Sequence, residues 1–82
     1  MMPYTYVYLL ESASHPGKHY TGVTGDLKER LSRHNAGQVS HTSKYVPWEL
    51  QVAVAFQDNE KAVNFEKYLK SHSGRSFAKK HF

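Results

Sequence analysis

The sequence predicts a small α+β (α/β) domain, in which helices flank a three-stranded antiparallel sheet in the order β-β-α-β-α, with a further helix at the end. Two observations lead to this fold class. β-Branched and aromatic residues gather in three short segments, residues 4–10, 19–23 and 48–56, as is typical of strands. Residues 25–35 and 60–71 carry apolar residues at helical spacing and separate or follow these strands.

The first two strands are expected to form a hairpin, because Pro16-Gly17 marks a turn between them. A helical crossover then leads to the third strand. Strand three therefore runs in the same direction as strand two, and strand one fits between them, antiparallel to both.

The helix boundaries follow from capping residues. Thr24 can cap the first helix, Asp26 favours its positive N-terminal end, and Gly37 lies just past its C-terminus. Asp58 or Asn59 caps the second helix. Residues 74–82 could add a short final helix through two phenylalanines.

In the third strand, the large side chains at alternate positions are expected on one face of the sheet, with two alanines on the other. The large residues are Trp48, Leu50, Val52, Val54 and Phe56, and the alanines are Ala53 and Ala55.

Length and composition restrict the class of protein. The 82 residues make one domain, residues 1–82, because a chain of this size has room for one core only. The absence of cysteine excludes disulfides and thiolate–zinc sites and fits a reducing compartment. No apolar run could span a membrane, and Met1 to Tyr8 lack the features of a signal peptide. We therefore expect a cytoplasmic protein with no membrane association.

The formal net charge is +4, and the positive charge is concentrated near the end of the chain. No acid follows Glu66, whereas the basic residues after it are Lys67, Lys70, Arg75, Lys79 and Lys80. A basic surface attracts polyanions such as nucleic acid. Charge alone does not separate this reading from a basic face that is simply solvated.

Two tyrosines could meet on one face of the hairpin. Tyr8 shares a face of strand one with Tyr4 and Tyr6, and Tyr20 shares a face of strand two with Gly22, which leaves space beside it. The alternative is that these tyrosines are cross-strand aromatic pairs that stabilise the hairpin.

The first helix places an arginine and a histidine together. Leu27, Leu31 and His34 form one stripe, with Arg30 on its edge and one turn from His34. Arg30 can reach phosphate oxygens. It could instead lie over Leu27 and pair with an acid, and His34 could be a hydrogen-bonded packing residue.

Glu66 falls inside the apolar arc of the second helix, where a carboxylate is costly unless a cation or donor meets it. We consider three partners: Arg30, a tyrosine hydroxyl or a divalent metal. A buried Glu66–Arg30 pair would be purely structural, whereas a metal would make Glu66 part of a functional site.

Together these residues resemble the GIY-YIG nuclease family over almost the whole chain. The two named motifs correspond to Tyr6-Val7-Tyr8 and Tyr20-Thr21-Gly22, and Arg30 and His34 lie in a segment similar to the family's arginine helix. Glu66 matches the metal-binding glutamate. The chain looks closest to small stand-alone bacterial members, relatives of the N-terminal nuclease domain of the excision-repair incision enzyme.

The resemblance implies roles for five residues. Tyr8 and Tyr20 would be the active-site tyrosines, and Arg30 would hold the scissile phosphate. His34 would assist the tyrosine or sit near the nucleophile. Glu66 would bind a single Mg²⁺ or Mn²⁺ ion, and Tyr8, Tyr20, Arg30 and Glu66 should line one cleft.

The sequence departs from the family pattern at four places. Tyr6 replaces the glycine of the first motif and Thr21 the isoleucine of the second. Val23 stands where some members carry a lysine. Ala78 and Lys79 occupy the region in which many members carry an asparagine.

The resemblance therefore implies a metal-dependent DNA endonuclease in repair, recombination or defence. A nucleic-acid-binding module with little or no nuclease activity, and a small interaction or dimerisation protein, are the alternatives. The candidate DNA-contacting residues are Arg33, Lys44, Tyr45, Arg75 and Lys79. Residues 41–48, which hold two of these, could instead be a connector tethered by Trp48. So small a domain touches few phosphates, so we expect weak binding or a homodimer.

Overall fold

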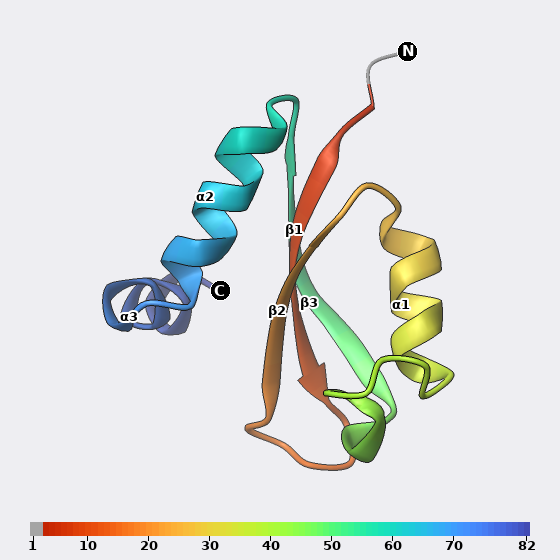
Figure 1. Ribbon diagram of the computed structural model, residues 1–82. Helices are drawn as coiled ribbons and strands as arrows, with labels where there is room; N and C mark the ends of the chain where they lie inside the picture. Colours follow the sequence, from red (N-terminus) through yellow and green to blue (C-terminus); the bar gives the residue numbers. More distant parts are fainter. Residues whose placement is uncertain (1–2) are drawn as a thin grey trace.

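The expected order of elements is confirmed in a computed structural model, which describes residues 3–82 (Figure 1). The expectations placed on Met1 and Met2 lie outside the described residues. The strands are β1 (Thr5–Ser12), β2 (His19–Thr24) and β3 (Trp48–Phe56), and the helices are α1 (Leu27–Asn35), α2 (Asn59–Leu69) and α3 (His72–His81), with a 3₁₀ turn η1 (Ser43–Tyr45) before β3. No helix within residues 3–82 is long and apolar enough to cross a membrane.

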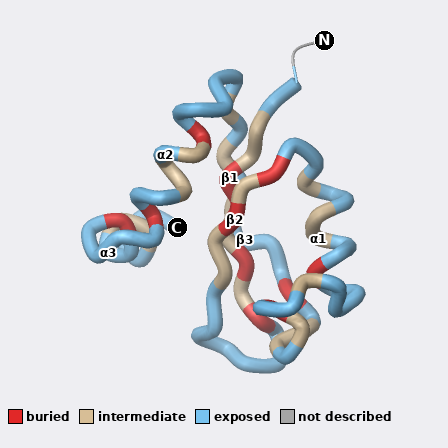
Figure 2. The backbone as a smooth tube through the Cα atoms, viewed as in Figure 1, coloured by how far each residue is buried: buried red, intermediate tan, exposed pale blue. Residues whose placement is uncertain are grey.

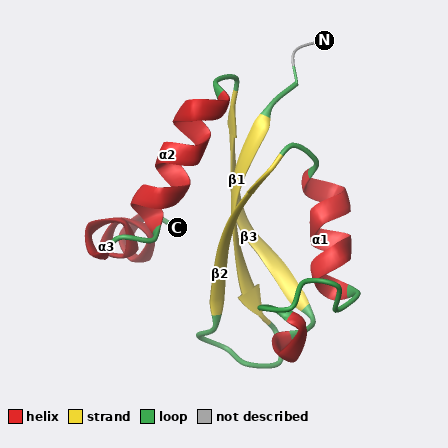
Figure 3. Cartoon of the chain, viewed as in Figure 1, coloured by secondary structure: helices red, strands yellow, loops and turns green. Residues whose placement is uncertain are grey.

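The sheet has the predicted antiparallel topology, with strand order β2-β1-β3 and β1 in the centre. Helix α1 covers one face, and α2 and α3 cover the other (Figures 1 and 3). Burial concentrates along the sheet and on the helix faces turned toward it (Figure 2). The fold is therefore a sheet with a separate small core on each side.

The two cores differ in chemistry. Under α1, the buried residues are Tyr8, Leu10 and Trp48, with Leu27 and Leu31 packed against them. Under α2 and α3, the core is aliphatic and aromatic, and its members are Val7, Ala62 and Leu69 with Val23, Phe56, Phe65, Phe77 and Ala78.

The predicted alternation of β3 is wrong in its first half. The register with β1 shifts between Leu9 and Leu10, which pair with Val52 and Leu50, so Gln51 is an extra residue on β3. A bulge of this kind moves all earlier side chains to the opposite face. Trp48 therefore packs in the α1 core, and Leu50 is 40% exposed.

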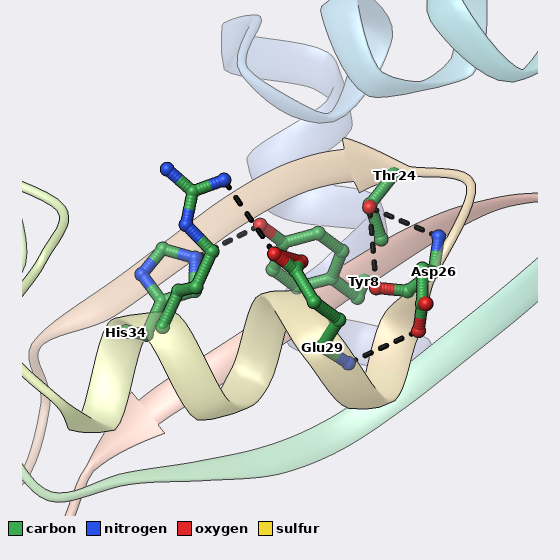
Figure 4. Close-up of polar contacts among 6 residues, drawn as sticks. Tyr8, Thr24, Asp26, Glu29 and His34 are labelled. Atoms are coloured by element: carbon green, nitrogen blue, oxygen red, sulfur yellow. Dashed lines mark hydrogen bonds and ion pairs between the residues drawn. The ribbon is translucent and has the colours of Figure 1, made fainter.

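The cap of α1 also differs from the expectation. Asp26 caps the helix by accepting a hydrogen bond from the Glu29 N–H (3.0 Å), whereas the Thr24 hydroxyl accepts from the Asp26 N–H (3.1 Å) (Figure 4). Thr24 thus shapes the turn before the helix. Gly37 lies just past the end of α1 with φ of +73°, a conformation that favours glycine.

The last helix is longer than expected and packs tightly onto α2. Ser71 caps it by accepting from the Gly74 N–H (3.1 Å). Gly74 is buried, and a Cβ atom there would overlap the Tyr68 carbonyl. A larger residue at this position would force α3 away from α2.

Candidate active site

The site begins with a buried contact between β1 and α1. The Tyr8 hydroxyl and His34 Nε2 are 2.9 Å apart and form a hydrogen bond (Figure 4). Tyr8 is 1% exposed and His34 0%. The Tyr20 ring from β2 lies against both, with its centroid 4.9 Å from that of His34 and 6.2 Å from that of Tyr8. The sheet thus gathers both tyrosines and the histidine on the α1 face.

Gly22 makes room for this cluster. It is directly opposite Tyr8 in the register of β1 and β2. A Cβ atom on Gly22 would lie 2.5 Å from the Tyr8 Cζ and Oη atoms and 2.9 Å from the Tyr20 ring. The position beside the tyrosine hydroxyl therefore requires glycine.

Arg30 brings an unpaired donor to the same place. Its Nε atom is buried and has no hydrogen-bond partner within residues 3–82. The ion pairs in this part of the chain are His19–Glu11, Arg33–Glu29 and Lys70–Glu66, so Arg30 has no carboxylate partner. A buried guanidinium donor without a partner is costly, and an anion such as phosphate would satisfy it.

The pKa values of Tyr8 and His34 reflect this environment. Burial raises the pKa of the Tyr8 phenol, and Tyr20 and Glu66 add to this effect, while Arg30 opposes it. Burial lowers the pKa of His34, and the positive charges of Arg30 and Arg33 lower it further. Near neutral pH, Tyr8 therefore keeps its proton and His34 is neutral.

Glu66 has a partner that the sequence analysis did not consider. Its carboxylate, 13% exposed, lies 2.5 Å from the Lys70 ammonium one turn along α2. Glu66 does not pair with Arg30. Helix α2 covers the face of the sheet opposite α1, and the negative charge of Glu66 makes the smallest contribution to the raised pKa of Tyr8.

Glu66 is also the candidate metal ligand. Within residues 3–82, no three His, Asp or Glu side chains gather into a metal site. Magnesium commonly uses one or two carboxylates and completes its shell with water and phosphate oxygens. A single carboxylate would therefore fit a metal that binds together with a phosphate, and Lys70 would compete with that metal for the carboxylate.

A basic groove of about 970 Å³ runs between β2 and α3. Tyr20 lines it, together with Lys70 and two of the candidate DNA-contacting residues, Arg75 and Lys79. Neither Tyr8, Arg30 nor Glu66 lines this groove. The structure thus connects the tyrosine cluster to the groove through Tyr20, at the β2 edge of the sheet.

The other candidate DNA-contacting residues lie apart from this groove. Arg33 forms an i,i+4 ion pair with Glu29 on the solvent side of α1 (3.7 Å). Lys44 and Tyr45 form part of η1, and the Tyr45 ring packs against Trp48. The Trp48 indole donates a hydrogen bond to the Thr42 carbonyl (2.9 Å), so Trp48 ties this segment to the start of β3.

The sequence analysis missed two residues that touch the site. Lys70 could have been found from its i,i+4 spacing to Glu66. Thr42, whose hydroxyl is 2.8 Å from His34 Nδ1, could not, because no local pattern links a loop residue to a helix.

Comparison with known proteins agrees with this arrangement. A family model described as the GIY-YIG catalytic domain matches residues 4–80. The chain belongs to the GIY-YIG family.

The similar proteins are small ones. The UPF0213 protein SpyM50708 of Streptococcus pyogenes serotype M5 is 39% identical over 72 residues, which are 87% of this chain and 76% of that protein. The corresponding protein SpyM3_1077 of serotype M3 is 38% identical over the same shares. The solution NMR structure of the UPF0213 protein BH0048 from Bacillus halodurans has 31% identity and a TM-score of 0.55, covering 92% of this chain and 81% of that one.

Proposed function

We propose that this GIY-YIG protein is a divalent-metal-dependent endonuclease that hydrolyses DNA phosphodiester bonds, in repair, recombination or defence against foreign DNA. The observation that carries the proposal is the buried, unpartnered Arg30 Nε beside the Tyr8–His34 pair. It supplies an anion-binding donor next to a group that can accept a proton, and phosphodiester hydrolysis requires both.

Tyr8 is the better candidate for the base of the two tyrosines. Its hydroxyl bonds to His34, whereas Tyr20 contacts the histidine through its ring. The attacking water gives a proton to Tyr8 Oη while the phenolic proton passes to His34 Nε2. The new O–P bond forms, the P–O3′ bond breaks, and the leaving oxygen takes a proton from solvent.

Access and charge set the conditions for this step. Because Tyr8 is 1% exposed, water reaches its hydroxyl only after a covering side chain moves. A phosphate on Arg30 would also neutralise a charge that lowers the pKa of His34, so bound substrate makes His34 a better proton acceptor.

Glu66 would hold the Mg²⁺ or Mn²⁺ ion, which when bound supplies positive charge at the leaving 3′-oxygen. Arg75 and Lys79 in the basic groove would contact phosphates of the same DNA on one side of the site. Arg33, Lys44 and Tyr45 are proposed as weaker outer contacts. A homodimer would extend this small contact surface, and this prediction stays open.

The test is nicking of supercoiled, branched and single-stranded DNA with Mg²⁺ or Mn²⁺. Arg30→Ala and Glu66→Gln should each lower the rate by about 100-fold or more, because each removes stabilisation of transition-state charge. Lys28→Ala and Glu60→Gln remove exposed charges of the same sign from the same two helices and should leave the rate within about twofold. No cleavage of any substrate, or equal cleavage by all four variants, would refute the nuclease.

A second candidate is a nucleic-acid-binding module with little nuclease activity. It is favoured by the Lys70 ammonium on the Glu66 carboxylate and by Ala78 and Lys79 in place of the family's asparagine. This module would still bind DNA with a negative log–log dependence on salt. An interaction protein that uses its aromatic surface would not.

A further inference from the structure

The imidazole of His34 is completely buried, and both of its nitrogens have a partner. Nε2 is 2.9 Å from the Tyr8 hydroxyl, and Nδ1 is 2.8 Å from the Thr42 hydroxyl. A neutral imidazole carries one N–H, so one contact has the ring as donor and the other has it as acceptor. Which tautomer is present decides whether Tyr8 can give its proton to His34.

Counting hydrogens along this chain selects one tautomer. The Thr42 hydroxyl donates to the Val39 carbonyl (3.3 Å), which can only accept. Its oxygen then accepts from Nδ1–H, and Nε2 accepts from the Tyr8 hydroxyl. With this tautomer, every donor hydrogen in the Tyr8–His34–Thr42 hydrogen-bond chain has an acceptor.

With the opposite tautomer, one donor hydrogen of this hydrogen-bond chain has no acceptor. If Nε2 carried the hydrogen, it would donate to Tyr8 Oη, and the Thr42 hydroxyl would turn from Val39 to Nδ1. The phenolic hydrogen of Tyr8 would then have no acceptor among the hydrogen bonds of residues 3–82, although Tyr8 is 1% exposed. A buried donor without a partner is unfavourable.

Thr42 is itself firmly held, although it lies in a loop. It is 1% exposed, its N–H donates to the Val39 carbonyl (3.0 Å), and its carbonyl accepts from the Trp48 indole (2.9 Å). Trp48 is held in turn by Asn35, which is next to His34 in α1 and donates to the Trp48 carbonyl (3.1 Å). The fold therefore fixes the Thr42 hydroxyl relative to the imidazole.

We propose that Thr42 is a positioning residue that holds His34 as the Nδ1–H tautomer, so that Nε2 is free to accept the proton of Tyr8. The catalytic consequence rests on the proposed function, but the tautomer does not. With its hydrogen directed at Nε2, the Tyr8 oxygen keeps a lone pair for a proton from the attacking water.

The tautomer can be measured without metal or DNA. Long-range ¹H–¹⁵N NMR of the full chain, at a pH at which His34 is neutral, separates the protonated from the unprotonated ring nitrogen. We expect a protonated Nδ1 and an unprotonated Nε2 in the wild type. A protonated Nε2 overturns the proposal, and this measurement requires no variant.

Variants then test the role of the hydroxyl. Thr42→Val keeps the shape of the side chain but removes the acceptor, so the His34 ring should become a mixture of tautomers. Thr42→Ser keeps the hydroxyl and should retain the wild-type pattern. Thr5→Val is the control, because the Thr5 hydroxyl also bonds to a side chain, Asn59, but far from the site (3.1 Å). An unchanged tautomer in Thr42→Val overturns the proposal.

Kinetics connect the tautomer to cleavage. For Thr42→Val, kcat should fall by about 10- to 100-fold with KM nearly unchanged, and Thr42→Ser should recover most of the rate. Unfolding curves of both variants separate this loss from a loss of folded protein. If the tautomer is as expected but the wild type cleaves no DNA, the proposed function fails and the positioning role of Thr42 stands. Full kcat in Thr42→Val despite a mixed tautomer overturns the catalytic consequence.

Discussion

The two faces of the sheet are built from different chemistry. Under α2 and α3, phenylalanine rings pack around a buried Val7, with a tilted Phe56–Phe65 pair at a centroid distance of 5.6 Å and an edge-on Phe65–Phe77 pair at 6.3 Å. Under α1, the centre is a hydrogen-bonded chain through Tyr8, His34 and Thr42, with an unpartnered donor on Arg30 beside it.

The apolar face under α2 and α3 mainly contributes to folding stability, whereas the polar face under α1 holds the tyrosine, histidine and arginine of the candidate site. Burial of apolar area needs no special orientation, whereas buried polar groups are favourable only when every donor and acceptor is satisfied. Among residues 3–82, the one buried side-chain nitrogen or oxygen without a hydrogen-bond partner is Arg30 Nε, the atom at which we propose that a phosphate binds. Mutations on the two faces should therefore produce different losses.

The largest stability loss is expected from the α2 face. Phe56→Ala removes a partly buried ring that packs on Phe65 and should lower the free energy of unfolding by about 2–4 kcal/mol. Urea unfolding measures this loss. Cleavage per folded molecule should change far less than in Glu66→Gln, because the ring lies on the opposite face from Tyr8 and the variant keeps the Glu66 carboxylate on α2. Leu50→Ala, at a residue that is 40% exposed, is the control and should cost less than about 1 kcal/mol. A fall in kcat of folded Phe56→Ala would show that the faces are coupled.

On the α1 face, a smaller and pH-dependent stability effect is expected from His34. Burial and the charges of Arg30 and Arg33 lower its pKa in the folded chain, so the unfolded chain binds more protons below the ordinary value of 6.5. The contribution of His34 is fully present above about pH 6.5 and is lost as the pH falls below it. The raised pKa of Tyr8 has the opposite sign, so stability also falls above about pH 10, where only the unfolded phenol ionises.

Urea unfolding between about pH 5 and pH 8 checks the His34 effect. The other charged or titratable groups around His34 are Tyr8 on β1, Tyr20 on β2, and Arg30 and Arg33 on α1. His34→Gln should flatten the pH dependence in this range, and the exposed His41→Gln should not. An equal slope in both variants would show that His34 is not the source.

Sequence patterns predicted the helices and strands that form the two faces of the sheet better than they predicted the side-chain contacts on each face. Alternation and caps were sufficient for the element order, and β3 has the predicted bounds Trp48–Phe56. The bulge at Gln51 was not predictable, because period-2 alternation assumes that no extra residue interrupts the pairing. Thr42 was missed for a related reason: its contact with His34 depends on how a loop folds back on α1.

Glu66 was identified from its place in an apolar arc, but its partner was not. Lys70 lies one turn further along α2, and its ammonium pairs with the carboxylate that we propose for the metal. The omission has a chemical consequence, because a cation already bound to a ligand competes with the metal for it.

The smallest predicted effect follows from this competition. Lys70 is 53% exposed, and an exposed i,i+4 pair contributes only about 0.5 kcal/mol. Lys70→Gln should therefore barely change stability, but it should tighten Mn²⁺ binding to the DNA-free chain by at least about twofold, the equivalent of that energy. Electron paramagnetic resonance titration of free Mn²⁺ measures this. The control is Lys67→Gln on the same helix, because Lys67 has no ion pair with any residue in the described part of the chain. Weaker Mn²⁺ binding in Lys70→Gln than in Lys67→Gln would mean that Lys70 supports the metal site at Glu66 instead of competing with the metal for the carboxylate.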